Sequence, residues 1–127
     1  MLNLAVIGSG YWGKNLVRNF NDLGALHTIC DKNAKTLQDF HENYPGAKIV
    51  TQCEAVFEDP DIDAVAIATP AETHFEVARL AMLAGKHVYV EKPLALSVHE
   101  AEQLHQMAVG LNLKLMVGHI SSITRRL

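Results

Sequence analysis

Three glycines near the N-terminus recur at a fixed spacing, in the run Gly8-Ser9-Gly10-Tyr11-Trp12-Gly13. An apolar segment precedes this run and an amphipathic one follows it, so the run predicts a turn between a strand and a helix. In such a turn the first glycine allows a tight bend, the second leaves room for a diphosphate, and the third lets the helix pack closely on the strand. The helix N-terminus adds free N–H groups and a partial positive charge. The run therefore predicts a dinucleotide site, and a glycine-rich turn of an unrelated α/β protein is the alternative.

An acidic residue follows the next apolar run at the distance that a dinucleotide site requires. Asp31 lies about twenty residues beyond the glycine run, where a carboxylate can accept hydrogen bonds from both hydroxyls of the adenosine ribose. The same carboxylate would repel a 2′-phosphate, so NAD is favoured over NADP. The neighbouring Lys32 would partly offset that repulsion. The alternative role for Asp31 is the N-cap of the helix that follows.

Two further segments follow predicted strands and are candidate binding residues for the same reason. Ala68-Thr69-Pro70 ends the most strand-like segment of the chain, and ligands of open α/β sheets bind at the carboxyl ends of strands. His74, on the first turn of the next helix, would reach the same crevice, or else be a solvated histidine on the helix face.

Glu91-Lys92-Pro93 follows the next strand and contains the candidate acid/base group. A lysine held near the nicotinamide by a rigid turn would hydrogen-bond a substrate hydroxyl and take its proton while hydride leaves the carbon. Taken alone, a Lys-Pro turn after a strand is usually a solvated turn. The position of Lys92 after a strand of this predicted fold favours the catalytic role.

The elements that position these residues form a regular alternation of short apolar runs and longer amphipathic stretches, which is typical of parallel strands joined by crossover helices. The fold class is therefore α/β, a doubly wound parallel six-stranded Rossmann sheet in a single domain. The predicted strands span residues 2–7, 25–30, 49–50, 63–69, 87–90 and 113–117. The predicted helices span residues 14–23, 34–44, 54–58, 71–84 and 97–109. The first has one apolar stripe, formed by Leu16, Val17, Phe20 and Leu23. The last begins with a capping box formed by Ser97 and Glu100.

The composition of the chain argues against several classes of function. The 127 residues carry 11 basic and 14 acidic side chains, a net charge of −3, which gives no cationic field for nucleic acid or an anionic membrane. No apolar run has the length of a bilayer span and no signal peptide is evident, so a cytoplasmic location is expected. Cys30 and Cys53 belong to no cysteine motif and are expected to be reduced. The seven histidines form no HExxH motif, so no metal site is predicted.

Together these motifs resemble the N-terminal domain of the Gfo/Idh/MocA oxidoreductases. The resemblance runs from Leu2 to about His119, and its most diagnostic piece is Glu91-Lys92-Pro93-Leu94, because family members carry their catalytic lysine in a Glu-Lys-Pro motif. It implies NAD as hydride carrier, Lys92 as the catalytic residue and a sugar or sugar nucleotide as substrate. Within the family, residues 11–20 are similar to the branch that oxidises the 3-hydroxyl of UDP-N-acetylglucosaminuronic acid.

The chain departs from the family pattern at its C-terminal end. Family members continue into a substrate-binding domain, so we expect residues 1–120 to form the dinucleotide-binding domain and the substrate domain to be absent. Residues 121–127 are atypical, because family members of the similar branch usually continue with Leu-Leu-Tyr-His-Pro-Ala-Ile at this point. Deletion of one base from suitable codons for that peptide would produce the residues found here. A frameshift after Ile120 is therefore our hypothesis.

Three functional hypotheses follow for such a chain. The first is a dehydrogenase domain that binds NAD but is inactive alone. The second is a stand-alone dinucleotide-binding module or subunit, and the third is a folded gene fragment without a selected role. Apolar surface left uncovered is expected to make the chain a homo-oligomer.

Overall fold

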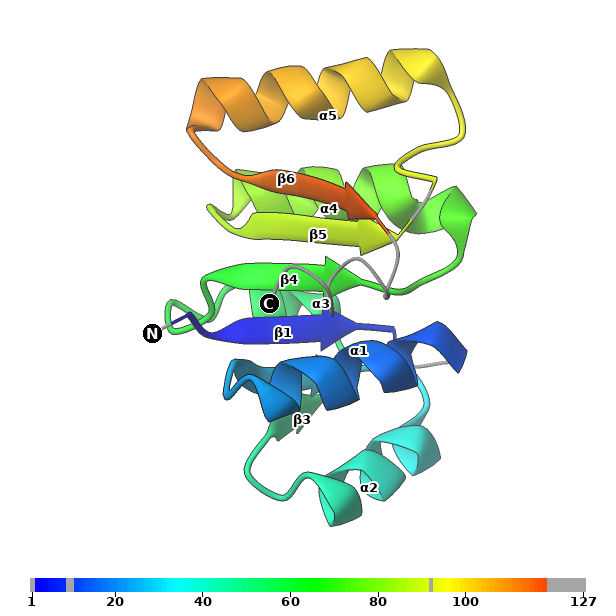
Figure 1. Ribbon diagram of the computed structural model, residues 1–127, viewed down its shortest axis with the longest axis vertical. Coiled ribbons are helices and arrows are strands. Elements are labelled where there is room, and N and C mark those ends of the chain that lie inside the picture. The colour runs from blue at the N-terminus through cyan, green and yellow to red at the C-terminus, as the bar shows by residue number, and fades with distance from the viewer. Residues whose placement is uncertain (1, 9–10, 92, 119–127) are drawn as a thin grey trace.

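The computed structural model describes residues 2–8, 11–91 and 93–118, and of Tyr11 and Trp12 the backbone alone. Strands and helices alternate along these residues (Figure 1). The strands are β1 (Leu4–Ile7), β2 (Leu26–Cys30), β3 (Lys48–Val50), β4 (Ala64–Ile67), β5 (His87–Glu91) and β6 (Leu115–Gly118). The helices are α1 (Tyr11–Asp22), α2 (Ala34–Asn43), α3 (Cys53–Phe57), the 3-10 helix η1 (Ala71–Thr73), α4 (His74–Leu83) and α5 (Val98–Leu111).

The strands form one sheet in the order β3-β2-β1-β4-β5-β6, and every neighbouring pair is parallel. The predicted doubly wound Rossmann sheet is confirmed. The chain leaves β1 toward β2 and β3 on one side, then returns to β4, β5 and β6 on the other. The carboxyl ends of the strands lie at a common edge, where the labelled arrowheads of Figure 1 point the same way. The strand order reverses between β1 and β4, which is where such sheets bind ligands.

Side chains from both faces of the sheet are buried, because successive residues of a strand point to opposite sides. Leu4 and Val6 of β1 pack in the cluster formed with α1 and α2. Ala5 and Ile7, which alternate with them along the strand, pack in the cluster formed with α3, α4 and α5. Two apolar layers thus fix the register of β1 at the centre of the sheet and hold its carboxyl end, and the glycine that follows, in a defined position.

The first helix differs from its prediction at both ends. It begins at Tyr11, three residues before the expected start, so Gly13 lies within its first turn. Leu16, Val17 and Phe20 are buried as expected, but Leu23 is 46% exposed and its assignment to the apolar stripe was wrong. The cause is that the helix ends at Asp22 and Gly24 takes a positive φ of 75°, which turns the chain away.

The later helices also differ in their bounds. The helix expected over residues 71–84 is a 3-10 turn after Pro70 followed by α4. The expected end of α5 near Val109 was too early, because the helix runs through Gly110 and stops where Asn112 adopts the left-handed conformation. The Ser97 side chain accepts a hydrogen bond from the Glu100 N–H, as the capping box predicts.

In the described part of the chain, no helix has both the length and the apolar character needed to cross a bilayer. Residues 121–127, for which the frameshift is our hypothesis, lie outside the described residues.

Candidate functional site

Gly8 directly follows β1 and packs closely against Thr69, after β4. Its φ is +84°, and a Cβ built on it would lie 2.9 Å from both the Thr69 backbone nitrogen and the Thr69 Cγ2. Its amide donates a hydrogen bond of 2.8 Å to the carbonyl of Cys30 in β2. Only glycine meets both demands without displacing the end of β4. The predicted role of Gly8 in a tight turn therefore agrees with the geometry around it.

A cavity of about 1030 Å³ lies over this edge of the sheet, and Gly8 lines it. Segments that follow four strands contribute its walls, so it spans the point where the strand order reverses. Eight of the predicted site residues line it: Gly8, Asp31, Lys32, Ala68, Thr69, Pro70, His74 and Glu91. The structure thus brings together residues that are up to 83 positions apart in sequence, from Gly8 to Glu91. Their part in binding stays a prediction.

Asp31 lies at one side of the cavity, directly after β2. One of its carboxylate oxygens accepts a hydrogen bond of 2.8 Å from the Asn33 N–H. The N-cap of α2 is Asn33, whose side chain accepts from the Thr36 N–H, so the alternative role of Asp31 as the N-cap was wrong. The carboxylate instead shapes the bend before the helix, and Lys32 beside it is exposed in the cavity wall.

The segment after β4 is tied to the start of α4 by side chains. The Thr73 hydroxyl lies 2.7 Å from the hydroxyl of Thr69 and 2.7 Å from the carbonyl oxygen of Pro70. His74 is buried, so its alternative assignment as a solvated helix-face residue was wrong. Its ring contacts the backbone carbonyls of Thr69 and Pro93. Pro93 itself is exposed and does not line the cavity.

The other predicted residues divide between those the structure describes and those it does not. Gly13 is buried in α1. Glu91 ends β5, where one carboxylate oxygen lies 3.4 Å from the Tyr89 hydroxyl. Ser9, Gly10 and Lys92, and the side chains of Tyr11 and Trp12, lie outside the described residues.

Two cysteines that sequence reasoning did not place in the site line the same cavity. Cys30 at the end of β2 and Cys53 at the start of α3 are both free thiols, as expected, and they are hydrogen-bonded to each other. The bond from Cys30 stabilises a thiolate at Cys53 and lowers the pKa of Cys53 to about 7, with the positive charge of Lys32 acting in the same direction. The same bond and burial raise the pKa of Cys30. Cys53 is therefore the more reactive of the two thiols.

Thr51, Gln52 and Glu54 also line the cavity and were missed. They follow β3, whose three residues give a weak pattern. The rule that singled out Asp31 and Thr69, that ligands bind after the carboxyl ends of parallel strands, would have found them.

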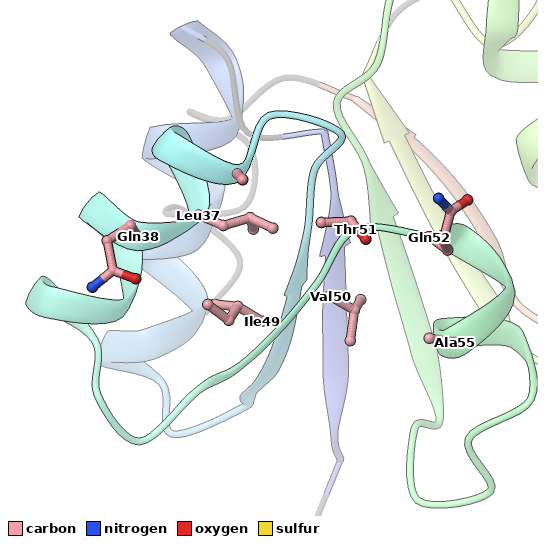
Figure 2. Close-up of a pocket in the computed structure, with 8 residues that line it drawn as sticks. Leu37, Gln38, Ile49, Val50, Thr51, Gln52 and Ala55 are labelled. Atoms are coloured by element: carbon pink, nitrogen blue, oxygen red, sulfur yellow. The ribbon is translucent and has the colours of Figure 1, made fainter.

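A second, smaller cavity of about 470 Å³ adjoins this region. Figure 2 shows Leu37 of α2 and Ile49 of β3 directed toward each other in its wall. Thr51 and Gln52 line both cavities, but none of the described residues that line the smaller one is charged. The larger cavity, which has Asp31, Lys32 and Glu91 in its walls, is the candidate site.

The site fits a nucleotide carrying a diphosphate. Gly8 carries no side chain where it lines the cavity, and α1 begins three residues later at Tyr11. A turn of this kind at a helix N-terminus accommodates phosphate oxygens. Asp31 on the neighbouring strand supplies an acceptor for sugar hydroxyls.

Comparison with known proteins agrees with this geometry. A profile described as "Oxidoreductase family, NAD-binding Rossmann fold" (Gfo/Idh/MocA) matches residues 2–119. UDP-N-acetylglucosamine 3-dehydrogenase of Acidithiobacillus ferrooxidans is 33% identical over 122 residues, which are 96% of this chain and 38% of that protein. The scyllo-inositol 2-dehydrogenase (NADP(+)) of Bacillus subtilis is 27% identical over 93% of this chain and 33% of its own length.

A solved structure of GenD2 from gentamicin A biosynthesis, in complex with NAD, superposes with a TM-score of 0.86. It is 30% identical, and the match covers 92% of this chain and 34% of GenD2. The chain thus spans between 33% and 38% of the length of these three proteins.

Proposed function

Because the chain belongs to the Gfo/Idh/MocA family of NAD-binding Rossmann oxidoreductases, we propose that its larger cavity binds NAD and that Lys92 is the acid/base residue for oxidation of a sugar hydroxyl. The observation that carries the proposal is the position of Gly8. It has a positive φ, lies against Thr69, and stands where the strand order reverses. A dinucleotide-binding turn requires this combination, and a solvated glycine turn does not.

In this proposal, different residues along the cavity would bind different parts of the dinucleotide. The turn at Gly8 and the start of α1 would hold the diphosphate, and Asp31 would hold the adenosine ribose. The ends of β4 and β5 would flank the nicotinamide. The bound dinucleotide supplies the hydride acceptor. Lys92 would hydrogen-bond the substrate hydroxyl and take its proton as the carbon is oxidised.

NAD is the form that the charges favour. In this proposal the Asp31 carboxylate, which lines the cavity, would stand against the 2′-phosphate of NADP, and like charges repel. The exposed Lys32 reduces this repulsion without removing the carboxylate. Relatives of both kinds exist, since GenD2 was solved in complex with NAD and the scyllo-inositol dehydrogenase of Bacillus subtilis is named for NADP(+).

Calorimetric titration of Gly8→Ala and Gly85→Ala with NAD tests the proposal. Both glycines have nearly the same positive φ, 84° and 82°, but a Cβ at Gly85 meets nothing within 4 Å. Each variant should lose about 1–2 kcal/mol of stability from backbone strain. Only Gly8→Ala should weaken NAD binding, by more than tenfold, because only there does the added carbon clash with Thr69 and displace residues that line the cavity. Absence of NAD binding by the unaltered chain, or an equal effect of both variants, would refute the proposal.

Asp31→Asn tests the selectivity for NAD. The amide oxygen of asparagine can still accept the hydrogen bond from the Asn33 N–H, so the bend before α2 is kept while the charge is lost. Binding of NAD should weaken about tenfold, and the ratio of NADP to NAD affinity should rise. Titration of both nucleotides measures the ratio, and an unchanged ratio would mean that Asp31 does not face the ribose.

For the 127-residue polypeptide assayed alone, we expect NAD binding without steady turnover. The matched relatives are about 2.5 to 2.7 times as long as these 127 residues, and we propose that in those proteins the part outside the match holds the sugar. The second candidate function is a dinucleotide-binding module that acts without catalysis. The six-stranded Rossmann sheet formed by these residues favours it. Steady NAD reduction with UDP-N-acetylglucosamine or its uronic acid would contradict both expectations.

A further inference from the structure

The ring of His74 is held between two carbonyl oxygens from different segments. Its Nδ1 lies 2.6 Å from the carbonyl oxygen of Pro93, and its Nε2 lies 2.8 Å from that of Thr69. The side chain is 3% exposed, so bulk water does not compete for either nitrogen. Both distances are those of formed hydrogen bonds.

Both partners of the ring are hydrogen-bond acceptors. A backbone carbonyl oxygen can only accept a hydrogen bond, whereas a neutral imidazole carries one N–H and one lone pair. Either neutral tautomer would thus direct a lone pair at a carbonyl oxygen less than 3 Å away, which is repulsive and leaves a buried acceptor unsatisfied. Only the doubly protonated ring donates at both contacts.

The two contacts join the ends of neighbouring strands at the cavity. Thr69 lies two residues beyond β4 and against Gly8, and Pro93 lies two residues beyond the end of β5. Among the described residues of η1, α4 and β5, the charged side chains are Glu72, Glu76, which pairs with Arg79, and Glu91, which lines the same cavity.

We propose that His74 is a buried imidazolium that acts as a positioning residue, fastening the segment after β5 to the end of β4. The charge assists both hydrogen bonds and makes each stronger than a bond between neutral groups. The segment it fastens includes Pro93, the residue that directly follows the Lys92 of the proposed function. The claim about the charge stands without that function, and the claim about positioning rests on it.

Nitrogen NMR of the unliganded chain at pH 7.5 tests the charge. An unperturbed imidazole, with a pKa of about 6.5, is about nine-tenths neutral at this pH. In a long-range proton–nitrogen correlation spectrum of the uniformly 15N-labelled protein, both ring nitrogens of His74 should show the shift of a protonated nitrogen. The His74→Gln spectrum, from which this signal is lost, assigns it. A lone-pair shift at either nitrogen would overturn the proposal, whether or not the chain binds NAD.

Titration with NAD tests the positioning role. His74→Phe keeps a ring but removes both donors, and should weaken NAD binding at least tenfold in the folded variant. His74→Gln retains an N–H donor group and should recover part of that loss. His105→Gln, at an exposed position of α5, is the matched control and should bind as the unaltered chain does.

The outcomes separate the two claims from the proposed function. Equal NAD affinity for folded His74→Phe and the unaltered chain would reduce His74 to a purely structural role and overturn the positioning claim. If the variant does not fold, the His74→Gln titration against the His105→Gln control decides the point. Failure of the unaltered chain to bind NAD would refute the proposed function, while the nitrogen spectrum would still decide the charge.

Discussion

At the scale of single residues, a residue of the cavity could be predicted from the sequence only where the fold requires that residue type at a fixed spacing. Gly8 follows from the spacing of three glycines after a strand, and Asp31 from its distance beyond them. Cys53 could not be found in this way, because a thiol has no spacing rule and its partner Cys30 is 23 positions away in sequence. Its reactivity depends on which groups the fold places beside it.

The reactivity of Cys53 is therefore a test at this scale. With its pKa lowered to about 7 by the hydrogen bond from Cys30, it is mostly thiolate above that pH and mostly thiol below it. Alkylation by iodoacetamide should accelerate as the pH rises through about 7 and then level off, while Cys30, with its raised pKa and buried side chain, stays slow. Mass spectrometry of the modified peptides measures both rates.

Cys53→Ser serves as the control for this experiment, since it leaves Cys30 as the remaining thiol. Saturating NAD should also slow modification of Cys53, because this residue lines the proposed nucleotide cavity. A rate that begins to rise only above about pH 8, as for an unperturbed thiol, would contradict the pairing of the two cysteines.

At the scale of elements, the alternation of strands and helices was evident from hydrophobic patterning, but the connections between elements were not. The Gly85-Lys86 pair after α4 has the composition of a solvated turn. In the structure Lys86 is 5% exposed, and its ammonium group donates to the carbonyls of Asp59 and Ile62, at 2.6 and 2.7 Å. The lysine thus joins the turn before β4 to the turn before β5. No local pattern encodes a contact between residues 24 and 27 positions apart.

Lys86→Met should be strongly destabilising. The substitution keeps most of the apolar stem but leaves two carbonyl oxygens without their charged donor, which costs about 2–4 kcal/mol of unfolding free energy. Lys35→Met is the matched control, since Lys35 is exposed on α2 and should change the stability by less than about 0.5 kcal/mol. Urea denaturation measures both. Equal midpoints for the two variants would show that the bonds of Lys86 contribute no net stability.

At the scale of the whole molecule, the sheet ends in β6, which pairs with β5 alone among the described strands. Met116 in this strand is exposed, as are Val109 and Leu111 of α5. Unpaired strand edges and exposed apolar side chains favour association. We therefore expect a dimer or larger assembly of the chain, as the sequence also predicts.

Light scattering over a range of concentrations tests this expectation. Met116→Lys places a charge on the edge strand and should shift the assembly toward monomer, because charged edge residues oppose strand pairing. Gln103→Lys, at an exposed site of α5, makes the same change of net charge and controls for it. A monomer at every concentration for the unaltered chain would contradict the expectation.

The hydrogen bond from the Gly8 amide to the Cys30 carbonyl extends the backbone hydrogen bonding between β1 and β2 to Gly8. Its amide proton should accordingly exchange with deuterated water as slowly as those of β1 and β2, rather than at the pace of a surface loop. Gly8 would then hold its position before any nucleotide arrives, and little ordering entropy remains to be lost at this residue on binding.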